Sequence, residues 1–229
     1  MSKPSILFVL TSHNKLGSLD KPTGWYLPEL AHPYHVLRNK ANITVASPKG
    51  GEAPLDPASV EAAKDDVSVS FLQNDSQVWK TTKKLSDFIG KAKDFDAIFY
   101  VGGHGPMFDL VDDPTSQALI REFWEADKIV SAVCHAPAVL YDVKLSDGSL
   151  LVAGKEVTAF TNAEEEQVGL TKAVPFLPEE ALNKASGGHF VKAKEPWAEK
   201  VAVSGRLITG QNPASATAVG EAIAKALKV

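Results

Sequence analysis

The sequence predicts an α/β fold, with a mostly parallel sheet sandwiched by helices in a single domain that spans residues 1–229. Apolar runs at 5–10 and 96–101 are continuous rather than alternating, which is typical of parallel strands covered on both faces. Segments with helical spacing lie between such runs, in the order of strand–helix–strand units. The length suits one domain, and no internal repeat or linker divides the chain.

The first half of the chain begins with such a unit. Pro28 and Pro33 imply that its helix starts early and is kinked. Glycine and proline at 47–51 mark a turn after the second strand. The expected elements are, in order, a strand at 5–10, a helix at 24–39, a strand at 41–46, an edge strand at 67–71 and a helix at 81–93.

The second half supplies the remaining strands and a small cap. Residues 171–198 are rich in proline, glycine and aromatic side chains, so we expect an ordered cap or insertion there. Short alternating segments at 150–153 and 156–159 suggest a hairpin-like excursion. The other expected elements are strands at 96–101, 129–133, 201–203 and 207–209, and helices at 114–127 and 213–227. A further helix is expected to begin after Asn162, its N-cap.

Composition excludes several classes of protein. The net charge of −4 is spread without long blocks of one sign, which argues against nucleic acid and membrane surfaces as partners. A single cysteine excludes an internal disulfide and favours a reducing compartment. The run at 5–10 is too short to span a bilayer. We therefore expect a soluble cytoplasmic protein, with the nucleus left open as a second compartment.

That single cysteine, Cys134, ends a predicted strand and is followed by His135 and the start of a helix. At such a turn the helix N-terminus favours an anion and lowers the pKa of a thiol. A free cysteine is also commonly a buried small hydrophobe, and the local pattern leaves the two interpretations even. Ligands bind beyond the carboxyl ends of parallel strands, where the first loop, Gly102–Pro106 and the Cys134 turn should meet. This convergence favours the reactive thiol.

Residues near these strand ends are candidates for stabilising a reacting oxygen. The segment Gly102-Gly-His-Gly105 lacks the spacing of a nucleotide-binding loop. Adjacent glycines instead let the backbone turn and aim amides at an oxygen. Gly103 and His104 are therefore candidate substrate-binding residues of an oxyanion hole, together with the amide of His135.

Acid–base candidates flank the thiol. His135 could act as a general base or proton shuttle, but it needs a carboxylate to fix its tautomer. Glu164, Glu165 and Glu166 supply three, of which two are expected to serve only the helix dipole. Glu29, in the first helix, could hand on a proton if burial raises its pKa.

Six segments, spread from the first loop to the second half of the chain, form a specific combination. They are Gly24-Trp-Tyr-Leu-Pro-Glu29, His32-Pro-Tyr34, Ala46-Ser-Pro-Lys-Gly-Gly51 with Leu55-Asp-Pro57, Gly102-Gly-His-Gly105, Ala132-Val-Cys-His-Ala136 and Thr161-Asn-Ala-Glu-Glu-Glu166. The combination resembles the PfpI-like branch of the class I glutamine amidotransferase-like superfamily, and within it the fungal-type glutathione-independent glyoxalases (glyoxalase III) that double as heat-shock chaperones.

The resemblance implies a flavodoxin-like core, a homodimer and a Cys134–His135–Glu166 triad with Glu29 hydrogen-bonded to the thiol. The family's spacing selects Glu166 over Glu165. The metal-binding insertion of the larger bacterial chaperone relatives is not visible in the sequence, and His32 and His35 have no further ligands nearby. We therefore expect no metal and no other cofactor.

The implied activity is that of a cofactor-independent lyase, which converts methylglyoxal, a 2-oxoaldehyde, to lactate through a cysteine hemithioacetal and an enediol. This activity would detoxify aldehydes during stress. One alternative is a stress chaperone for unfolded client proteins, or a redox sensor whose cysteine is oxidised. Another is a cysteine peptidase or amidase. The same thiol would serve each of these functions, so the residues alone do not separate them.

Overall fold

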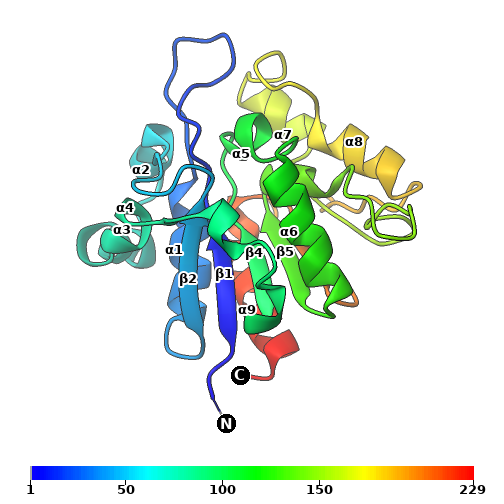
Figure 1. Cartoon of the computed structure of the whole chain (residues 1–229). Helices are drawn as coiled ribbons and strands as arrows, with labels where there is room; N and C mark the ends of the chain where they lie inside the picture. Colours follow the sequence, from blue (N-terminus) through cyan, green and yellow to red (C-terminus); the bar gives the residue numbers. More distant parts are fainter. Residues whose placement is uncertain (1) are drawn as a thin grey trace.

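Seven strands form one sheet in a computed structural model that describes residues 2–229. The strands are β1 (Ser5–Val9), β2 (Asn42–Ser47), β3 (Lys83–Lys84), β4 (Ala97–Tyr100), β5 (Ile129–Val133), β6 (Val201–Ser204) and β7 (Leu207–Gly210). Their order is β3-β2-β1-β4-β5-β7-β6, and every neighbouring pair except β6–β7 is parallel. The predicted mostly parallel sheet is confirmed (Figure 1).

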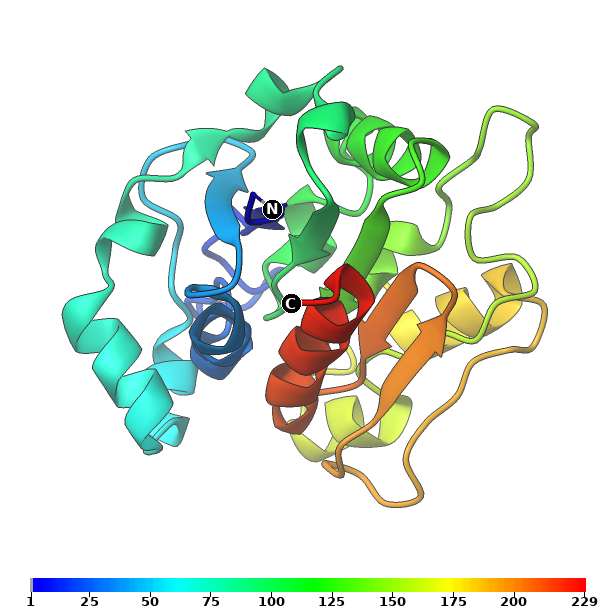
Figure 2. The ribbon, with the colours of Figure 1, turned by 90° about the horizontal axis from the view of Figure 1, so that it is seen from below.

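Helices cover both faces of the sheet. On one face α1 (Leu27–Leu37) and α9 (Ala216–Leu227) pack side by side, and α3 (Asp66–Asn74) packs on α1 (Figure 2). The other face carries α6 (Pro114–Glu125), α8 (Pro178–Ala185) and the 3₁₀ turn η3 (Ala136–Leu140). The remaining helices are α2 (Pro57–Ala62), α4 (Gln77–Lys80), α5 (Pro106–Asp109) and α7 (Asn162–Gln167), with 3₁₀ turns η1 (Leu85–Phe88), η2 (Ala92–Asp94) and η4 (Pro213–Ser215).

The central strands are mostly apolar because both of their faces are buried. In β1, Ile6 and Phe8 belong to the core under α1 and α9, whereas Leu7 and Val9 belong to the core under α6. Successive side chains of a strand point to opposite faces, so a continuous apolar run fills two cores at once. The same alternation holds in β4 and β5.

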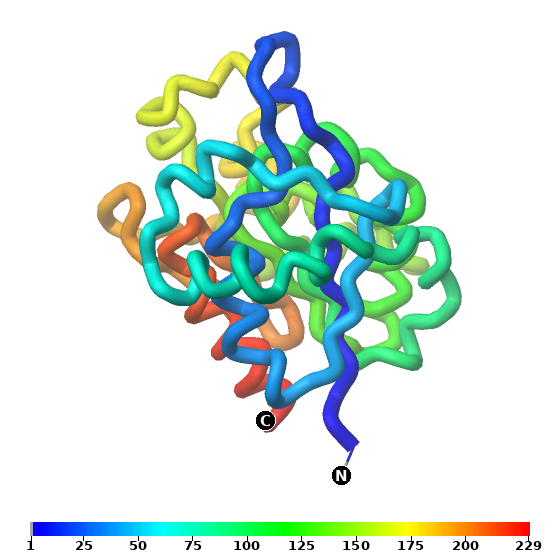
Figure 3. The backbone as a smooth tube through the Cα atoms, turned by 90° about the vertical axis from the view of Figure 1, so that its left-hand side faces the viewer, coloured from blue at the N-terminus to red at the C-terminus, as the bar shows by residue number. Residues whose placement is uncertain are grey.

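The strand order reverses at the boundary between β1 and β4. The chain leaves β1 toward α1 on one face and leaves β4 toward α6 on the other. Such a reversal opens a crevice beyond the carboxyl ends of the strands. Both termini lie at the opposite end of the sheet (Figures 1 and 3). The loops after β1, β4 and β5 therefore meet at the end of the molecule away from the termini.

Two predicted elements in the first half of the chain are wrong. Residues 67–71, expected as an edge strand, lie in α3, where Val67 and Phe71 are one helical turn apart on the buried side. The Asp65 side chain caps this helix by accepting from the Ser68 amide at 2.9 Å. Residues 81–93, expected as one helix, form β3 and then η1 and η2, a tighter winding that Gly90, at φ 76°, interrupts.

The segment at 150–159 forms turns rather than a hairpin, and its only ladder contacts within residues 2–229 are isolated bridges to Lys144 and Phe190. The predicted cap at 171–198 is ordered and contains α8, which packs beside η3 (Figure 1). Within the described part of the chain, no helix has the length and apolar character needed to cross a bilayer.

Candidate active site

Cys134 lies on a sharp turn between β5 and η3. Its φ is 66°, a left-handed conformation that costs about 1–2 kcal/mol for a residue with a Cβ atom. Two hydrogen bonds hold it: its amide donates to the Gly210 carbonyl at 2.9 Å, and its carbonyl accepts from the Phe160 amide at 2.8 Å. Strain of this kind persists where a function needs it, which favours the reactive interpretation of Cys134.

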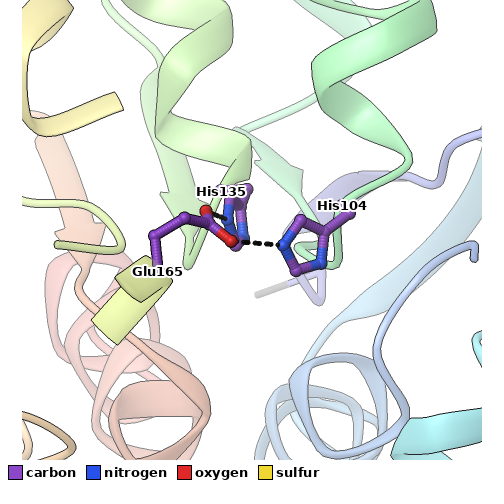
Figure 4. A group of neighbouring side chains, drawn as sticks. All are labelled: His104, His135 and Glu165. Atoms are coloured by element: carbon purple, nitrogen blue, oxygen red, sulfur yellow. Dashed lines mark hydrogen bonds and ion pairs between the residues drawn. The ribbon is translucent and has the colours of Figure 1, made fainter. Parts of the chain in front are cut away.

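His135 joins the thiol to a buried carboxylate. Its Nδ1 lies 3.4 Å from Cys134 Sγ, and its Nε2 lies 2.5 Å from Glu165 Oε2. The other oxygen of Glu165 is 2.9 Å from Nε2 of His104, so one carboxylate contacts two imidazoles (Figure 4). The arrangement of nucleophile, base and orienting acid is that of a catalytic triad.

The structure corrects the predicted acid of this triad from Glu166 to Glu165. Glu166 is exposed, and its carboxylate accepts from the Thr171 hydroxyl at 2.9 Å. The N-cap of α7 is Thr161, not Asn162, and Thr161 forms a capping box with Glu164. Successive residues of a helix are rotated by about 100° around its axis. Because Glu164 points back to the N-cap, Glu165 faces His135 and Glu166 faces solvent.

Glu164, the residue before that acid, fixes the position of α7. It is fully buried, and burial would raise its pKa, but its hydrogen bonds lower the pKa below the ordinary value. Its carboxylate accepts from the Thr161 amide and hydroxyl, the Trp197 amide, and the side-chain amides of Gln211 and Asn212. This one carboxylate therefore ties α7 to the cap and to the loop after β7.

Glu29 lies beside the thiol, as predicted, although without a hydrogen bond of good geometry. Both of its carboxyl oxygens are buried and unpartnered within residues 2–229. A Cβ atom on Gly102 would lie 2.1 Å from Glu29 Oε2 and 2.7 Å from Cys134 Cβ, so only glycine leaves room for the two to approach. Burial raises the pKa of Glu29 to about 8, which keeps it protonated at neutral pH.

The expected low thiol pKa is wrong. Burial first, and then the adjacent Glu29 carboxylate, raise the pKa of Cys134 well above its ordinary value. The turn that follows is the short 3₁₀ segment η3, which does not offset these effects. Ionisation of either group makes ionisation of the other harder, so the titrations of Glu29 and Cys134 are coupled. A protonated Glu29 removes the repulsion and leaves the thiol as the group that ionises during reaction.

The histidine is prepared to take the proton of that thiol. Burial, with His104 beside it, lowers the pKa of His135 to about 4, so the ring is neutral at physiological pH. Burial would raise the pKa of Glu165, but hydrogen bonds from His104 and His135 lower it well below its ordinary value. The ionised Glu165 accepts from Nε2 of His135, and Nδ1 is left free to accept from sulfur.

Gly103 is placed to hold an oxyanion. Its φ is 103°, and a Cβ atom there would lie 2.3 Å from the Gly24 carbonyl, so the loop needs glycine. The Gly103 amide is close enough to the thiol to favour its anion. The His135 amide has no backbone acceptor among the described residues. The Gly103 amide therefore borders the sulfur, whereas the predicted oxyanion role of His104 stays a prediction.

A cavity of about 60 Å³ opens above the thiol. At about 10–15 Å³ for each water-sized group, it holds roughly four to six such groups. Three aromatic side chains that line it, Tyr26, Phe160 and Trp197, come from separate segments, and the sequence did not assign them to the site. The lining residues are Tyr26, Gly103, His104, Cys134, His135, Phe160, Val168, Trp197 and Pro213.

His104, His135 and Glu165 offer atoms within 4.8 Å of one another and could in principle hold a metal. Their N–O distances of 2.5 and 2.9 Å suit shared protons, since two ligands of a tetrahedral zinc lie about 3.3 Å apart. His32 is occupied structurally: it contacts the Thr217 hydroxyl at 2.7 Å and Asp65 at 3.0 Å.

Comparison with known proteins matches residues 27–226 to a family model described as the DJ-1/PfpI family. The Schizosaccharomyces pombe protein named Glutathione-independent glyoxalase hsp3102 is 33% identical over 219 residues, covering 90% of each chain. The crystal structure of glyoxalase III from Candida albicans is 29% identical, with a TM-score of 0.88 over 97% of each chain. Rapid Encystment Protein 24 KDa of Francisella tularensis is 37% identical, with a TM-score of 0.91 over 98% of this chain and 99% of that one.

Proposed function

The chain belongs to the DJ-1/PfpI family, and from that premise we propose that it is a glutathione-independent glyoxalase. It converts a 2-oxoaldehyde such as methylglyoxal to a 2-hydroxy acid such as lactate. Two relatives described above carry glyoxalase names, and each alignment covers at least 90% of both chains. The observation that carries the proposal is the line from Cys134 through His135 to Glu165 beneath a cavity for a small molecule.

The reaction begins with transfer of the Cys134 proton to Nδ1 of His135. The thiolate adds to the aldehyde carbon, C1, and the amides of Gly103 and His135 hold the oxygen on which charge develops. Protonated Glu29 stabilises the sulfur anion without adding a second charge. His135 returns its proton to the C1 oxygen, which completes the hemithioacetal and frees Nδ1. His135 then moves the carbon-bound proton from C1 to C2 through an enediol, and water releases 2-hydroxy acid from the resulting thioester.

The size of the cavity favours this chemistry over a peptidase or amidase. Cys134 is 3% exposed, and the cavity above it is closed in by Tyr26, Phe160 and Trp197. An extended peptide cannot reach the sulfur without displacing those side chains. A five-atom 2-oxoaldehyde matches the available space.

Lactate formation from methylglyoxal without glutathione is the direct test. The native protein is expected to turn over, and Cys134→Ala to be inactive. A Cys134→Ala protein that still formed lactate would remove the nucleophile from the proposal. Aggregation assays with that inactive variant address the predicted chaperone function separately, because suppression of client aggregation would then be independent of turnover.

The predicted homodimer, unfolded client proteins and cytoplasmic location remain predictions within this proposal. The single cysteine agrees with a reducing compartment. Sedimentation velocity on the full chain measures the oligomeric state.

A further inference from the structure

His104 repeats the arrangement of the catalytic histidine but has no part in the mechanism above. Its Nε2 lies 2.9 Å from Glu165 Oε1, and its ring lies 4.0 Å from that of His135, centroid to centroid, with 40° between the planes. Figure 4 shows the two rings converging on one carboxylate from different elements. His104 also lines the cavity above the thiol.

The shared carboxylate sets the tautomer of both rings. An ionised carboxylate only accepts hydrogen bonds, so Nε2 of each ring carries a proton. Nδ1 of His135 faces Cys134 Sγ at 3.4 Å. Nδ1 of His104 has no hydrogen-bond partner among residues 2–229. Each ring is thus oriented through one nitrogen and free at the other, which is the geometry of a general acid–base residue.

The proposed reaction requires two proton transfers, not one. When the hemithioacetal becomes a thioester, the carbon-bound hydrogen of C1 must reach C2. The hydroxyl proton on the C1 oxygen must also leave, because that oxygen ends as the thioester carbonyl. The C2 oxygen, a ketone at the start, must gain a proton to end as a hydroxyl. A single imidazole beside the sulfur would have to perform both transfers in turn.

We propose that His104 is a second catalytic acid–base residue, which exchanges the oxygen-bound proton between the two substrate oxygens while His135 carries the carbon-bound proton. The C1–H bond breaks, its proton passes to His135 Nδ1, and its electrons form the C1–C2 double bond, which leaves the C2 oxygen as an anion. His104 Nδ1 takes the hydroxyl proton of the C1 oxygen and gives it to the C2 oxygen. C2 then takes the proton from His135 as the C1 oxygen becomes the thioester carbonyl. Both rings end as they began. This assignment rests on the proposed glyoxalase function.

Burial of the cluster explains why two histidines, rather than one, carry the two proton transfers. Side-chain exposure is 1% at His135 and Glu165 and 13% at His104. A net change of charge in so dry a site is costly. Every proton that moves stays within the substrate and the two rings, so the net charge of the site stays constant.

The test compares His104→Gln with the native protein and with His189→Gln, a control at an exposed histidine. Glutamine can still donate to Glu165 but cannot carry a proton. We expect kcat for lactate formation from methylglyoxal to fall about 10²-fold or more, with KM within threefold. Alkylation of Cys134 by iodoacetamide, which needs His135 but not His104, should stay within twofold of native. His189→Gln should match the native protein in both assays.

A second variant, His104→Ala, separates proton transfer from support of the structure. Added imidazole should raise the kcat of His104→Ala at least tenfold. It cannot do so if His104 only holds Glu165 in place. Turnover of His104→Gln within fivefold of native would overturn the assignment, and so would an equal loss of turnover and Cys134 alkylation. Absence of lactate formation by the native protein would instead reject the proposed function itself.

Discussion

At the scale of single residues, the choice between neighbouring glutamates in α7 gives the sharpest prediction. Glu165→Gln should lower kcat for methylglyoxal about 10²-fold, because glutamine can present an N–H to His135 and no longer stabilises its protonated form. Glu166→Gln should stay within twofold of native, since the Glu166 side chain is exposed and its carboxylate accepts a hydrogen bond from Thr171, away from the thiol. Steady-state lactate formation measures both. A large loss of kcat in Glu166→Gln, without one in Glu165→Gln, would instead identify Glu166 as the acid of the triad, as the family spacing implies.

Glu29 gives a second residue-scale prediction, on stability against pH. Its pKa is about 8 in the folded protein against 4.5 for the ordinary carboxyl. Below pH 4.5 both states are protonated and the group has no effect. Above it the unfolded chain ionises first, so folding loses stability progressively until pH 8. Glu29→Gln should therefore be more stable than native by about 3 kcal/mol at pH 7, and equal to it near pH 4.

Urea unfolding at pH 4.5, 6 and 8 measures this difference, with the exposed Glu61→Gln as control. A stability gain that did not grow with pH would show that Glu29 is ionised in the folded protein. The native carboxyl would be retained despite its cost because it supports the thiolate, a common conflict between stability and activity.

At the scale of the element, the central strands could be predicted because burial on both faces leaves a continuous apolar run. Val67-Ser-Val-Ser-Phe71 could not, since its alternation also places Val67 and Phe71 one helical turn apart. In the site, Cys134 followed from the expected convergence of three loops at the strand ends, and His135 from its adjacency to the thiol. To choose Glu165 from the sequence, one must know that α7 begins at Asn162. An error of one residue in the N-cap rotates each carboxylate by about 100° around the helix axis. The capping-box spacing of Thr161 and Glu164 was the available signal.

The role of the cap at 171–198 also belongs to this scale. Trp197, at its end, lines the cavity and is fixed by its amide hydrogen bond to Glu164 and its indole hydrogen bond to Gln167. Trp197→Ala should widen the entrance and raise kcat/KM for phenylglyoxal relative to methylglyoxal about tenfold. The 40% exposure of Trp197 predicts little change in melting temperature.

Competition assays with the two substrates measure that ratio, and Val203→Ala, at an exposed position on β6, serves as the control. An unchanged ratio in Trp197→Ala would mean that Tyr26 or Phe160 sets the size limit instead.

At the scale of the whole molecule, the site depends on packing behind the sheet. Glu29 projects from α1, and α1 is positioned by α9 at a point where Gly220 meets Pro33. A Cβ atom on Gly220 would lie 3.0 Å from Pro33 Cα and 3.3 Å from Val36 Cβ. A side chain at Gly220 would require α1 or α9 to shift by a few tenths of an ångström, so packing in this helix layer bears on the position of Glu29 beside the thiol.

Gly220→Val should therefore push α1 from α9, lower the free energy of unfolding by about 1–3 kcal/mol, and reduce kcat although the substitution lies outside the cavity. Ala226→Val, at an exposed position of the same helix, carries the β-branched propensity cost of about 0.5 kcal/mol without the clash. Urea unfolding and lactate formation, measured on both variants, separate these effects. Equal losses of stability in the two variants, with unchanged turnover in Gly220→Val, would show that the position of Glu29 is fixed by the loops at the strand ends alone.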